Sequence, residues 1–318
     1  MSRDPLVRAR GGEDAGSRAD RLDGRDAAAA AQLLSAACRW HPVSERRLRR
    51  KLFDHQGYQP DLALAVRGRT GRIDALAAAV VCGQSGSRPR AELVALATRP
   101  ARRRRGLAGT LYAEIEARLQ LRGVSEIAVG AGVLSSGLDL RYAAAVTMLL
   151  RRGFVPTGVV YDMALEPGRP APELPGPEGF AIRDLAEGDR ESLRALCAAE
   201  FPEWGYAPGL VRPGEPCGVI GAFDGQERLM AFAGWNEYIF GPTGTAAEHR
   251  GRGLGRAVFW RAVRAMGAAG FGERVCISVA NVGYYARAFG GRVSAAAWHM
   301  RREIPGRPDP GDKGDRRA

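Results

Sequence analysis

Two short runs of arginine and glycine in this 318-residue sequence have the composition of an anion-binding loop. Residues 103–108 read Arg-Arg-Arg-Gly-Leu-Ala, and residues 250–255 read Arg-Gly-Arg-Gly-Leu-Gly. Both fit the pattern Arg-x-x-Gly-x-Gly/Ala, and each opens a segment with apolar residues at helical spacing. The first N–H groups of a helix lack partners within the helix, and glycine lets a bulky anion approach them closely. Each run therefore predicts a cradle for a phosphate-bearing group.

The second run begins 147 residues after the first, and the strand-like and helix-like patterns around it repeat as well. A single Arg/Gly run is often a solvated loop in a chain rich in both residues. Two runs, each between a strand pattern and a helix pattern, favour phosphate cradles of common ancestry. A repeat of this size predicts two versions of one domain.

The second run resembles the acyl-CoA pyrophosphate loop of the GNAT N-acetyltransferase superfamily. The resemblance rests on residues 241–255, Gly-Pro-Thr-Gly-Thr-Ala-Ala-Glu-His-Arg-Gly-Arg-Gly-Leu-Gly, and extends over about residues 23–302. It implies an α/β fold with two tandem GNAT-like domains, each a mixed central β-sheet flanked by helices. It also implies acetyl-CoA as co-substrate, no metal, and direct attack of an amine on the thioester.

Apolar patterns predict the elements that would position these loops, in the same order in each half. Strands are expected in the first half at 62–67, 73–82, 91–98, 126–133 and 155–165, with helices at 25–39, 44–53, 106–121 and 141–152. Strands are expected in the second half at 180–183, 217–223, 228–235, 238–246, 274–279 and 292–302, with helices at 186–200, 253–266 and 282–289.

Five prolines between residues 166 and 179 predict an extended interdomain linker. We therefore expect an N-terminal domain at 23–165 and a C-terminal, catalytic domain at 180–304. The polar residues 1–22 are predicted to be disordered, and residues 305–318 to form a flexible tail.

The family pattern implies most of the cofactor contacts in the second half. The main-chain groups of Thr245 and Ala246 are expected to pair with the pantetheine arm and the carbonyl oxygen, and Asn281 to touch the same arm. Arg256 is expected to add a charge-assisted contact to the pyrophosphate. The expected cofactor-binding residues are Thr245, Ala246, Arg250, Gly251, Arg252, Gly253, Leu254, Gly255, Arg256 and Asn281.

Tyr285 lies on the helix where the family usually keeps a tyrosine that protonates the departing sulfur. Gly290 follows it by five residues instead of the usual four, and Tyr284 is its neighbour. The alternative interpretation of Tyr285 is a core aromatic on an amphipathic helix. Glu237 is the expected general base, at a turn near the acceptor; Glu248 and Glu203 are alternatives, and each is also typical of a solvated surface residue.

The first half keeps the cradle, with Ala108 in place of the last glycine, and loses the other features of the family pattern. Its late helix carries Met148 and Leu149 at the two positions where the acid tyrosine would fall, and Tyr142 comes too early. No asparagine lies between Val129 and Arg141. We expect this half to be degenerate, either without catalysis or binding CoA without turnover.

Composition limits the other partners. The chain has 47 Lys and Arg against 35 Asp and Glu, and a basic surface raises the encounter rate with an anionic cofactor. The arginines are dispersed and carry no nucleic-acid signature, so no nucleic acid is expected. Five cysteines without a Cys-x-x-Cys pair predict reduced thiols and a cytoplasmic protein. The four histidines lack metal-ligand spacing, no signal peptide is visible, and the longest apolar stretch, 75–82, is too short to span a membrane.

The sequence thus predicts an acyl-CoA-dependent N-acyltransferase that moves an acetyl group to the amine of a small molecule, acting as a monomer or homodimer. The alternative is a non-catalytic tandem protein that binds and senses acyl-CoA. A nucleic-acid binder is motivated by charge alone. A dinucleotide oxidoreductase does not fit, because residues 251–255 lack the Gly-x-Gly-x-x-Gly spacing and the later acidic residue.

Overall fold

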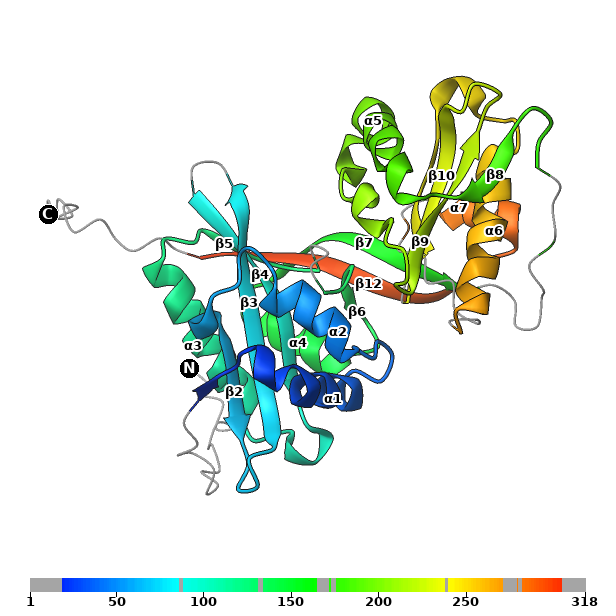
Figure 1. Cartoon of the computed structure of the whole chain (residues 1–318). Coiled ribbons are helices and arrows are strands. Elements are labelled where there is room, and N and C mark those ends of the chain that lie inside the picture. Colours follow the sequence, from blue (N-terminus) through cyan, green and yellow to red (C-terminus); the bar gives the residue numbers. More distant parts are fainter. Residues whose placement is uncertain are drawn as a thin grey trace, which may run out of the picture. The chain divides into compact units, whose positions relative to one another are not determined.

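The computed structural model of the chain separates into two compact units (Figure 1). It describes residues 19–85, 88–130, 134–164, 172, 176–237, 240–270, 279 and 282–304. Unit 1 comprises Met1–Val159 and Ala297–Ala318, and unit 2 comprises Val160–Ala296. Each unit is a β-sheet flanked by helices, which confirms the predicted α/β class.

Unit 1 is built on a sheet with the strand order β1-β2-β3-β4-β5-β12-β6, and β7 also pairs with β12. The β4–β5 pair is parallel, and the other pairs along this order are antiparallel. The strands are β1 (Asp20–Arg21), β2 (Ala63–Arg67), β3 (Ile73–Ser85), β4 (Arg88–Thr98), β5 (Glu126–Val129), β6 (Leu138–Asp139), β7 (Val155–Ala164) and β12 (Arg292–Glu303).

Helices cover both faces of the unit 1 sheet. The helices α3 (Leu107–Leu121) and α4 (Ala143–Arg151) pack on one face, and α1 (Ala27–Ala37) and α2 (Glu45–Leu48) pack on the other. A π-helical turn, Arg49–Phe53, continues α2. Successive side chains along strands such as β2 and β3 pack into opposite cores, because they point to opposite faces of the sheet.

A β-bulge interrupts this alternation in β4. Leu93 belongs to the core under α3, whereas the next two residues, Val94 and Ala95, both belong to the core under α1. The pairing with β3 shows the same break, because Ala78 pairs with Ala95 but Ala79 pairs with Leu93. A bulge bends a strand and re-aims the groups that follow it.

Unit 2 repeats the design on a smaller antiparallel sheet, in the order β11-β10-β9-β8. The strands are β8 (Ala181–Asp184), β9 (Cys217–Phe223), β10 (Leu229–Asn236) and β11 (Phe240–Thr245). The helices α6 (Leu254–Ala268) and α7 (Val282–Phe289) share one core with the sheet, and α5 (Arg190–Glu200) lies over a second core on the other face.

The two units are not consecutive along the chain, which differs from the domains predicted at 23–165 and 180–304. Strand β12 was predicted as the last strand of the second domain, but its final residues lie between β5 and β6 in the sheet of unit 1. Strand β7 begins in unit 1 and ends in unit 2, where Tyr161 pairs with Val279. An apolar pattern identifies a strand but does not say which sheet it joins.

The predicted disorder of residues 1–22 needs a correction at its end. Asp20 and Arg21 form strand β1 against β2, and Leu22 is only 1% exposed. Most of the predicted linker at 166–179, the tail at 305–318 and nearly all of the predicted strand at 274–279 lie outside the described residues. Within the described residues no helix is long and apolar enough to cross a membrane.

Candidate functional site

The two Arg/Gly runs adopt the same backbone conformation at equivalent positions. A short 3₁₀ turn precedes each run, at Pro100–Arg102 and at Ala247–His249, and a helix of 15 residues follows it. The residue before each helix is a glycine with positive φ, +81° at Gly106 and +86° at Gly253. Two residues earlier φ is again positive, 65° at Arg104 and 78° at Gly251.

The second cradle presents a series of backbone donors without acceptors. The first bond into α6 comes from Ala257 N–H to the Gly253 carbonyl, at 3.0 Å. In the part of the chain that the structure describes, the N–H groups of residues 251–256 donate to no protein group. A Cβ added at Gly251 would meet nothing within 4 Å, so this side of the loop is open. Such a row of amides at a helix N-terminus fits a diphosphate.

An arginine fixes each loop to the strand before it. Arg250 Nε donates to the Thr245 carbonyl at 3.1 Å, and Arg103 Nε donates to the Thr98 carbonyl at 3.4 Å. These residues occupy equivalent places in the repeat. The arginine side chains therefore brace the loops, in addition to adding positive charge beside them.

The same arginines are also tied to the last residue of the first helix in their unit, but by different groups. Arg103 Nη2 donates to the backbone carbonyl of Ala37 at 3.0 Å. Arg250 pairs with the carboxylate of Glu200 at 3.3 Å, and Ala247 N–H donates to the same carboxylate at 3.2 Å. Sequence reasoning missed Glu200, because nothing in the motif points 50 residues back to a helix end.

Strand β11 forms the outer edge of the unit 2 sheet among the described residues. Ala246 N–H donates to the Met230 carbonyl at 2.8 Å, so this predicted cofactor donor is used inside the sheet. Backbone groups alternate in direction along a strand, and the N–H of Thr245 therefore points to the open edge. A β-bulge lies between Phe240 and Thr243, where the pairing with β10 shifts.

Unit 1 contains a fork between two parallel strands. Strands β4 and β5 pair only from Arg90–Glu126 to Glu92–Ala128. Beyond this point β4 bulges at Val94 and continues to Thr98, with no strand paired to this edge within the described residues. The loop with Arg103 follows directly, so fork and cradle are continuous.

Of the two tyrosines on α7, Tyr284 has its hydroxyl at the cradle. A Cβ added at Gly255 would lie 3.3 Å from the Tyr284 hydroxyl oxygen and 3.2 Å from Thr245 Oγ1. Tyr284 is 40% exposed, and burial of its ring raises its pKa. The ring of Tyr285 instead packs near Phe259 and Phe289, and burial raises its pKa to about 12.

The remaining predicted residues are spread over the unit. Glu237 follows β10 at the far end of the β10–β11 hairpin from Thr245, about five strand residues or on the order of 17 Å away. Arg252 lies against His249, with Nη1 3.0 Å from Nδ1, and stacks on Phe180. Leu254 is buried and Arg256 is exposed. Asn281 lies outside the described residues.

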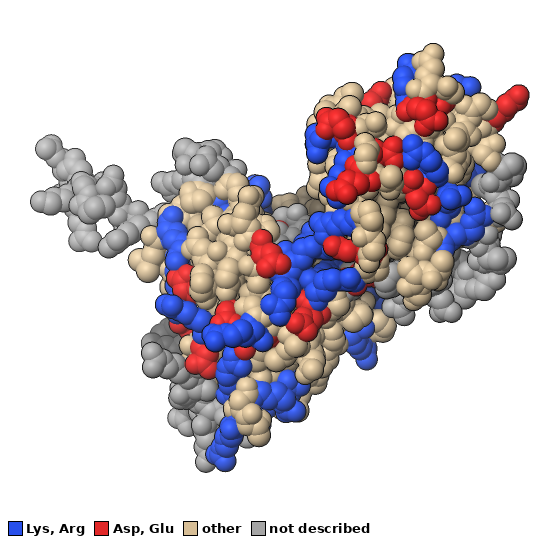
Figure 2. Space-filling model, in the orientation of Figure 1, with Lys and Arg blue, Asp and Glu red and all other residues tan. Residues whose placement is uncertain are grey.

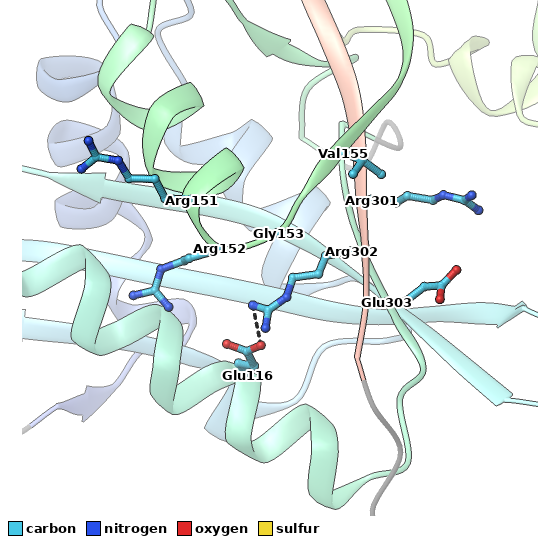
Figure 3. Close-up of a pocket in the computed structure, with 8 residues that line it drawn as sticks. All are labelled: Glu116, Arg151, Arg152, Gly153, Val155, Arg301, Arg302 and Glu303. Atoms are coloured by element: carbon cyan, nitrogen blue, oxygen red, sulfur yellow. Dashed lines mark ion pairs between the residues drawn. The ribbon is translucent and has the colours of Figure 1, made fainter. Parts of the chain in front are cut away.

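A hollow in unit 1 is lined by four arginines, and three of them, Arg152, Arg301 and Arg302, have protein partners (Figure 3). It has a volume of about 650 Å³. Arg302 pairs with Glu116 at 2.6 Å, and Arg152 donates to the Gly109 carbonyl at 2.9 Å. These contacts hold β12 and the end of α4 onto α3. The hollow is therefore a product of packing and a weaker candidate than the cradles.

No cluster of His, Cys, Asp or Glu within the described ranges has the arrangement of a metal site. The four cysteines in these ranges, Cys38, Cys82, Cys197 and Cys217, form no disulfide bond with one another. On the face shown in Figure 2, basic side chains occur on both units and are interspersed with acidic ones.

Residues 30–136 match the family model described as the acetyltransferase (GNAT) family. The matched segment falls in unit 1, in the half that was expected to be degenerate. No curated protein sequence matches the chain significantly.

Solved structures share the fold over almost the whole chain. A GCN5-related N-acetyltransferase from Sphaerobacter thermophilus is 20% identical, with 91% of this chain and 96% of that chain covered and a TM-score of 0.58. A tandem GNAT protein from the clavulanic acid biosynthesis pathway is 16% identical, with 91% and 99% covered and a TM-score of 0.68. A putative acetyltransferase from Pyrococcus horikoshii is 12% identical, with 94% of each chain covered and a TM-score of 0.61.

Proposed function

We propose that the chain, of which residues 30–136 match the GNAT acetyltransferase family model, is an acyl-CoA-dependent N-acyltransferase that moves an acetyl group from acetyl-CoA to the amine of a small molecule. The observation that carries the proposal is the cradle of unit 2, where the N–H groups of residues 251–256 have no protein acceptor among the described residues. Unpartnered amides at a helix N-terminus are satisfied by an anion, and a diphosphate has the charge and size for this row.

The rest of the donor would follow the edge of β11. The outward N–H of Thr245 is the backbone donor that the pantetheine arm meets after leaving the cradle. Gly255 allows this approach, because a Cβ there would crowd both Thr245 Oγ1 and the Tyr284 hydroxyl. Acetyl-CoA supplies the thioester, and the chain supplies its position and the movement of protons.

Tyr284 is the better candidate for the acid, although Tyr285 is the tyrosine that the family pattern predicts. The support is the position of the Tyr284 hydroxyl beside Gly255, while the Tyr285 ring packs in the aromatic core. A raised pKa keeps either phenol protonated at neutral pH, as an acid for a thiolate must be. Glu237 remains the proposed base on the acceptor side, and Asn281 the proposed contact to the pantetheine arm.

Gly253→Asp tests the cradle. Aspartate tolerates positive φ better than most residues, so the loop keeps its shape while a carboxylate repels the diphosphate. We expect the Kd for CoA at this cradle, measured by calorimetry, to rise about tenfold or more. Gly270→Asp is the matched control, because Gly270 also has positive φ and open space but lies beyond the other end of α6. An equal loss in both variants would contradict the assignment.

Tyr284→Phe and Tyr285→Phe test the acid. Thiol release from acetyl-CoA over a panel of amines should fall about tenfold or more in kcat for Tyr284→Phe, with the KM for acetyl-CoA little changed. Tyr285→Phe should alter stability more than rate. The reverse result would restore Tyr285 as the acid. CoA binding without thiol release from any amine would instead support the acyl-CoA sensor.

The further features of the proposal rest on composition and on the absence of a disulfide bond among the four described cysteines. We place the protein in the cytoplasm, with no nucleic-acid or membrane partner, as a monomer or homodimer. Size-exclusion chromatography with light scattering tests the oligomeric state. Steep salt dependence of binding to DNA or RNA would contradict the absence of a nucleic-acid partner.

A further inference from the structure

We propose that unit 1 is a second acyl-transfer centre, in which Tyr142 acts as the acid and His41 as the base beside the first cradle. The proposal shares the acyl-CoA donor with the proposed function and rests on it to that extent. Its substrates are an acyl-CoA thioester and a primary amine. Its residues belong to unit 1 alone, and no part of the family pattern assigned them a role.

The three polar side chains of this centre meet at the junction of α1, β6 and α4. His41 Nδ1 lies 3.4 Å from the Tyr142 hydroxyl and 3.6 Å from Asp139 Oδ2. The side chain of Asp139 is 1% exposed, and Arg141 holds it through Nε and Nη2. Trp40 N–H donates to the Tyr142 hydroxyl oxygen at 3.0 Å.

These contacts assign a direction to each proton. The buried carboxylate beside Nδ1 favours the tautomer with the proton on Nδ1, which makes Nε2 the basic nitrogen of His41. The oxygen of Tyr142 accepts from Trp40 N–H and faces Nδ1, so its own proton is directed elsewhere. Burial raises the pKa of Tyr142 to about 12, and the phenol stays protonated at neutral pH.

The cluster is attached to the first cradle through the end of α1. Arg103 of the cradle donates to the carbonyl of Ala37, the residue directly before Cys38. His41 N–H donates to the Cys38 carbonyl at 2.8 Å. Acid, base and cradle arginine are therefore linked by one short segment.

The same junction borders the fork of β4. Leu134 belongs to the same core as Val94, Ala95 and the end of α1, and this core includes residues of β4 beyond its last pair with β5. Arg47 Nη2 donates to the Leu134 carbonyl at 2.5 Å. Tyr142 and His41 thus stand on the α1 side of the fork.

The electrostatic setting of the first cradle favours an anionic donor more than that of the second. Residues 103–105 are three consecutive arginines, and Arg103 is held by carbonyl groups, with no carboxylate paired to it among the residues that the structure describes. In unit 2 the equivalent Arg250 faces the carboxylate of Glu200. Residues 45–53, which follow the His41 segment, add five basic residues to this unit. A local excess of positive charge strengthens attraction of a CoA diphosphate.

The transfer step balances with these groups alone. The nitrogen of a neutral amine forms the C–N bond to the acyl carbon as the C–S bond breaks. One amine proton passes to His41 Nε2, and the Tyr142 hydroxyl gives its proton to the departing sulfur. The proton on His41 Nδ1 then passes to the Tyr142 oxygen, so both side chains end uncharged and the products are an amide and free CoA thiol.

The experiment separates the two units by closing one cradle at a time. Thiol release from acetyl-CoA is measured on the full chain with hydroxylamine, a nucleophile that needs no fitted acceptor pocket, after subtraction of the uncatalysed rate. Gly253→Asp closes the second cradle and Gly106→Asp the first. Gly123→Asp, at a positive-φ glycine beyond the other end of α3, is the matched control for Gly106→Asp.

We expect thiol release to persist in Gly253→Asp and to fall at least tenfold further when Tyr142→Phe or His41→Gln is added. Tyr58→Phe and His55→Gln, changes of the same type elsewhere in unit 1, should leave it within twofold. If the activity persists in Gly106→Asp and vanishes in Gly253→Asp, this inference fails and the proposed site in unit 2 stands. If it vanishes only in Gly106→Asp, unit 1 is the sole centre. A chain that releases no thiol in any form overturns both proposals.

Discussion

Units 1 and 2 carry the same loop on the same scaffold, with different chemistry around it. The 3₁₀ turns, the positive φ angles and the arginine that reaches back to a strand carbonyl all recur at equivalent positions. The anchor of that arginine differs, since it is the carbonyl of Ala37 in unit 1 and the carboxylate of Glu200 in unit 2. The backbone of an anion cradle is thus preserved while its charge is tuned.

Closeness to the motif and the charge beside the loop are thus separate properties of the two cradles. The run in unit 2 is richer in glycine and closer to the family pattern, but Glu200 places a negative charge beside it. The run in unit 1 places Arg104 at positive φ and contains three consecutive arginines. The family model also matches unit 1.

The largest effect should come from strand β12, which unit 1 receives from the end of the chain. Met300 is 1% exposed under α3, so Met300→Asp buries an unpaired charge and should cost about 3 kcal/mol or more. Hydrogen exchange should accelerate in the peptides of unit 1 and much less in those of unit 2. Val293→Asp, at a 48% exposed position of the same strand, is the control. Equal loss of protection in both units would mean that they fold as one.

The next largest effect should come from Glu200, because neutralising its carboxylate removes the negative charge that distinguishes the second cradle from the first. Glu200→Gln keeps an oxygen for Ala247 N–H but removes the negative charge near Arg250, and we expect the affinity of the second cradle for CoA to rise about fivefold at low salt, or about 1 kcal/mol. Titration calorimetry on a Gly106→Asp background isolates this cradle. Glu203→Gln, a nearby exposed carboxylate, should change the affinity less. Weaker binding in Glu200→Gln would show that the contacts of Glu200 with Ala247 N–H and Arg250 matter more for CoA binding than its negative charge.

A swap at the first positive-φ position compares the strain in the two loops. Arg104→Gly should stabilise the chain and Gly251→Arg should destabilise it, each by about 0.5–1 kcal/mol, because an L-residue other than glycine is strained at positive φ. Shifts of the thermal midpoint in opposite directions would bear this out. Shifts of the same sign would mean that side-chain contacts of the arginine outweigh the backbone term.

The smallest expected effect is a change in unfolding free energy that appears only at high pH. It concerns one aromatic position of the repeat, in the helix that follows each cradle. Tyr112 on α3 and Phe259 on α6 are equivalent, and burial, aided by Glu116, raises the pKa of Tyr112 to about 12. An unfolded tyrosine has a pKa near 10, so folding keeps a proton that the unfolded chain loses. The stability from Tyr112 is therefore complete below about pH 10 and declines towards pH 12. Tyr112→Phe should flatten the fall in unfolding free energy between pH 9 and 11.5, and an unchanged slope would contradict this.

Most elements of the fold were predictable from the sequence, because each is a local pattern. The strand at 217–223 and the helix at 282–289 match β9 and α7, and the helices after both cradles agree within two residues. The partner of β12 was not predictable. Its alternation of apolar residues suits either sheet, and only the open place between β5 and β6 decides the choice.

In the candidate site, too, features set by neighbouring residues were predictable and features set by distant residues were not. The cradle depends on consecutive residues and on glycine at positive φ, so its position could be inferred from the motif. Glu200 and the cluster of His41, Asp139 and Tyr142 could not, because they meet residues that lie 50 to about 100 positions away. The choice between Tyr284 and Tyr285 depends on one residue of helix rotation, about 100 degrees, which no spacing rule resolves.

The place of β12 sets the order in which the protein can mature on the ribosome. Strands β5 and β6 emerge before unit 2 is made, yet the strand that lies between them emerges only after strands β8–β11 of unit 2. Domains generally fold as they leave the ribosome, beginning at the N-terminus. Here the first unit synthesised must wait with an unfilled gap in its sheet until residue 303 is released, which gives chaperones a defined interval in which to protect it.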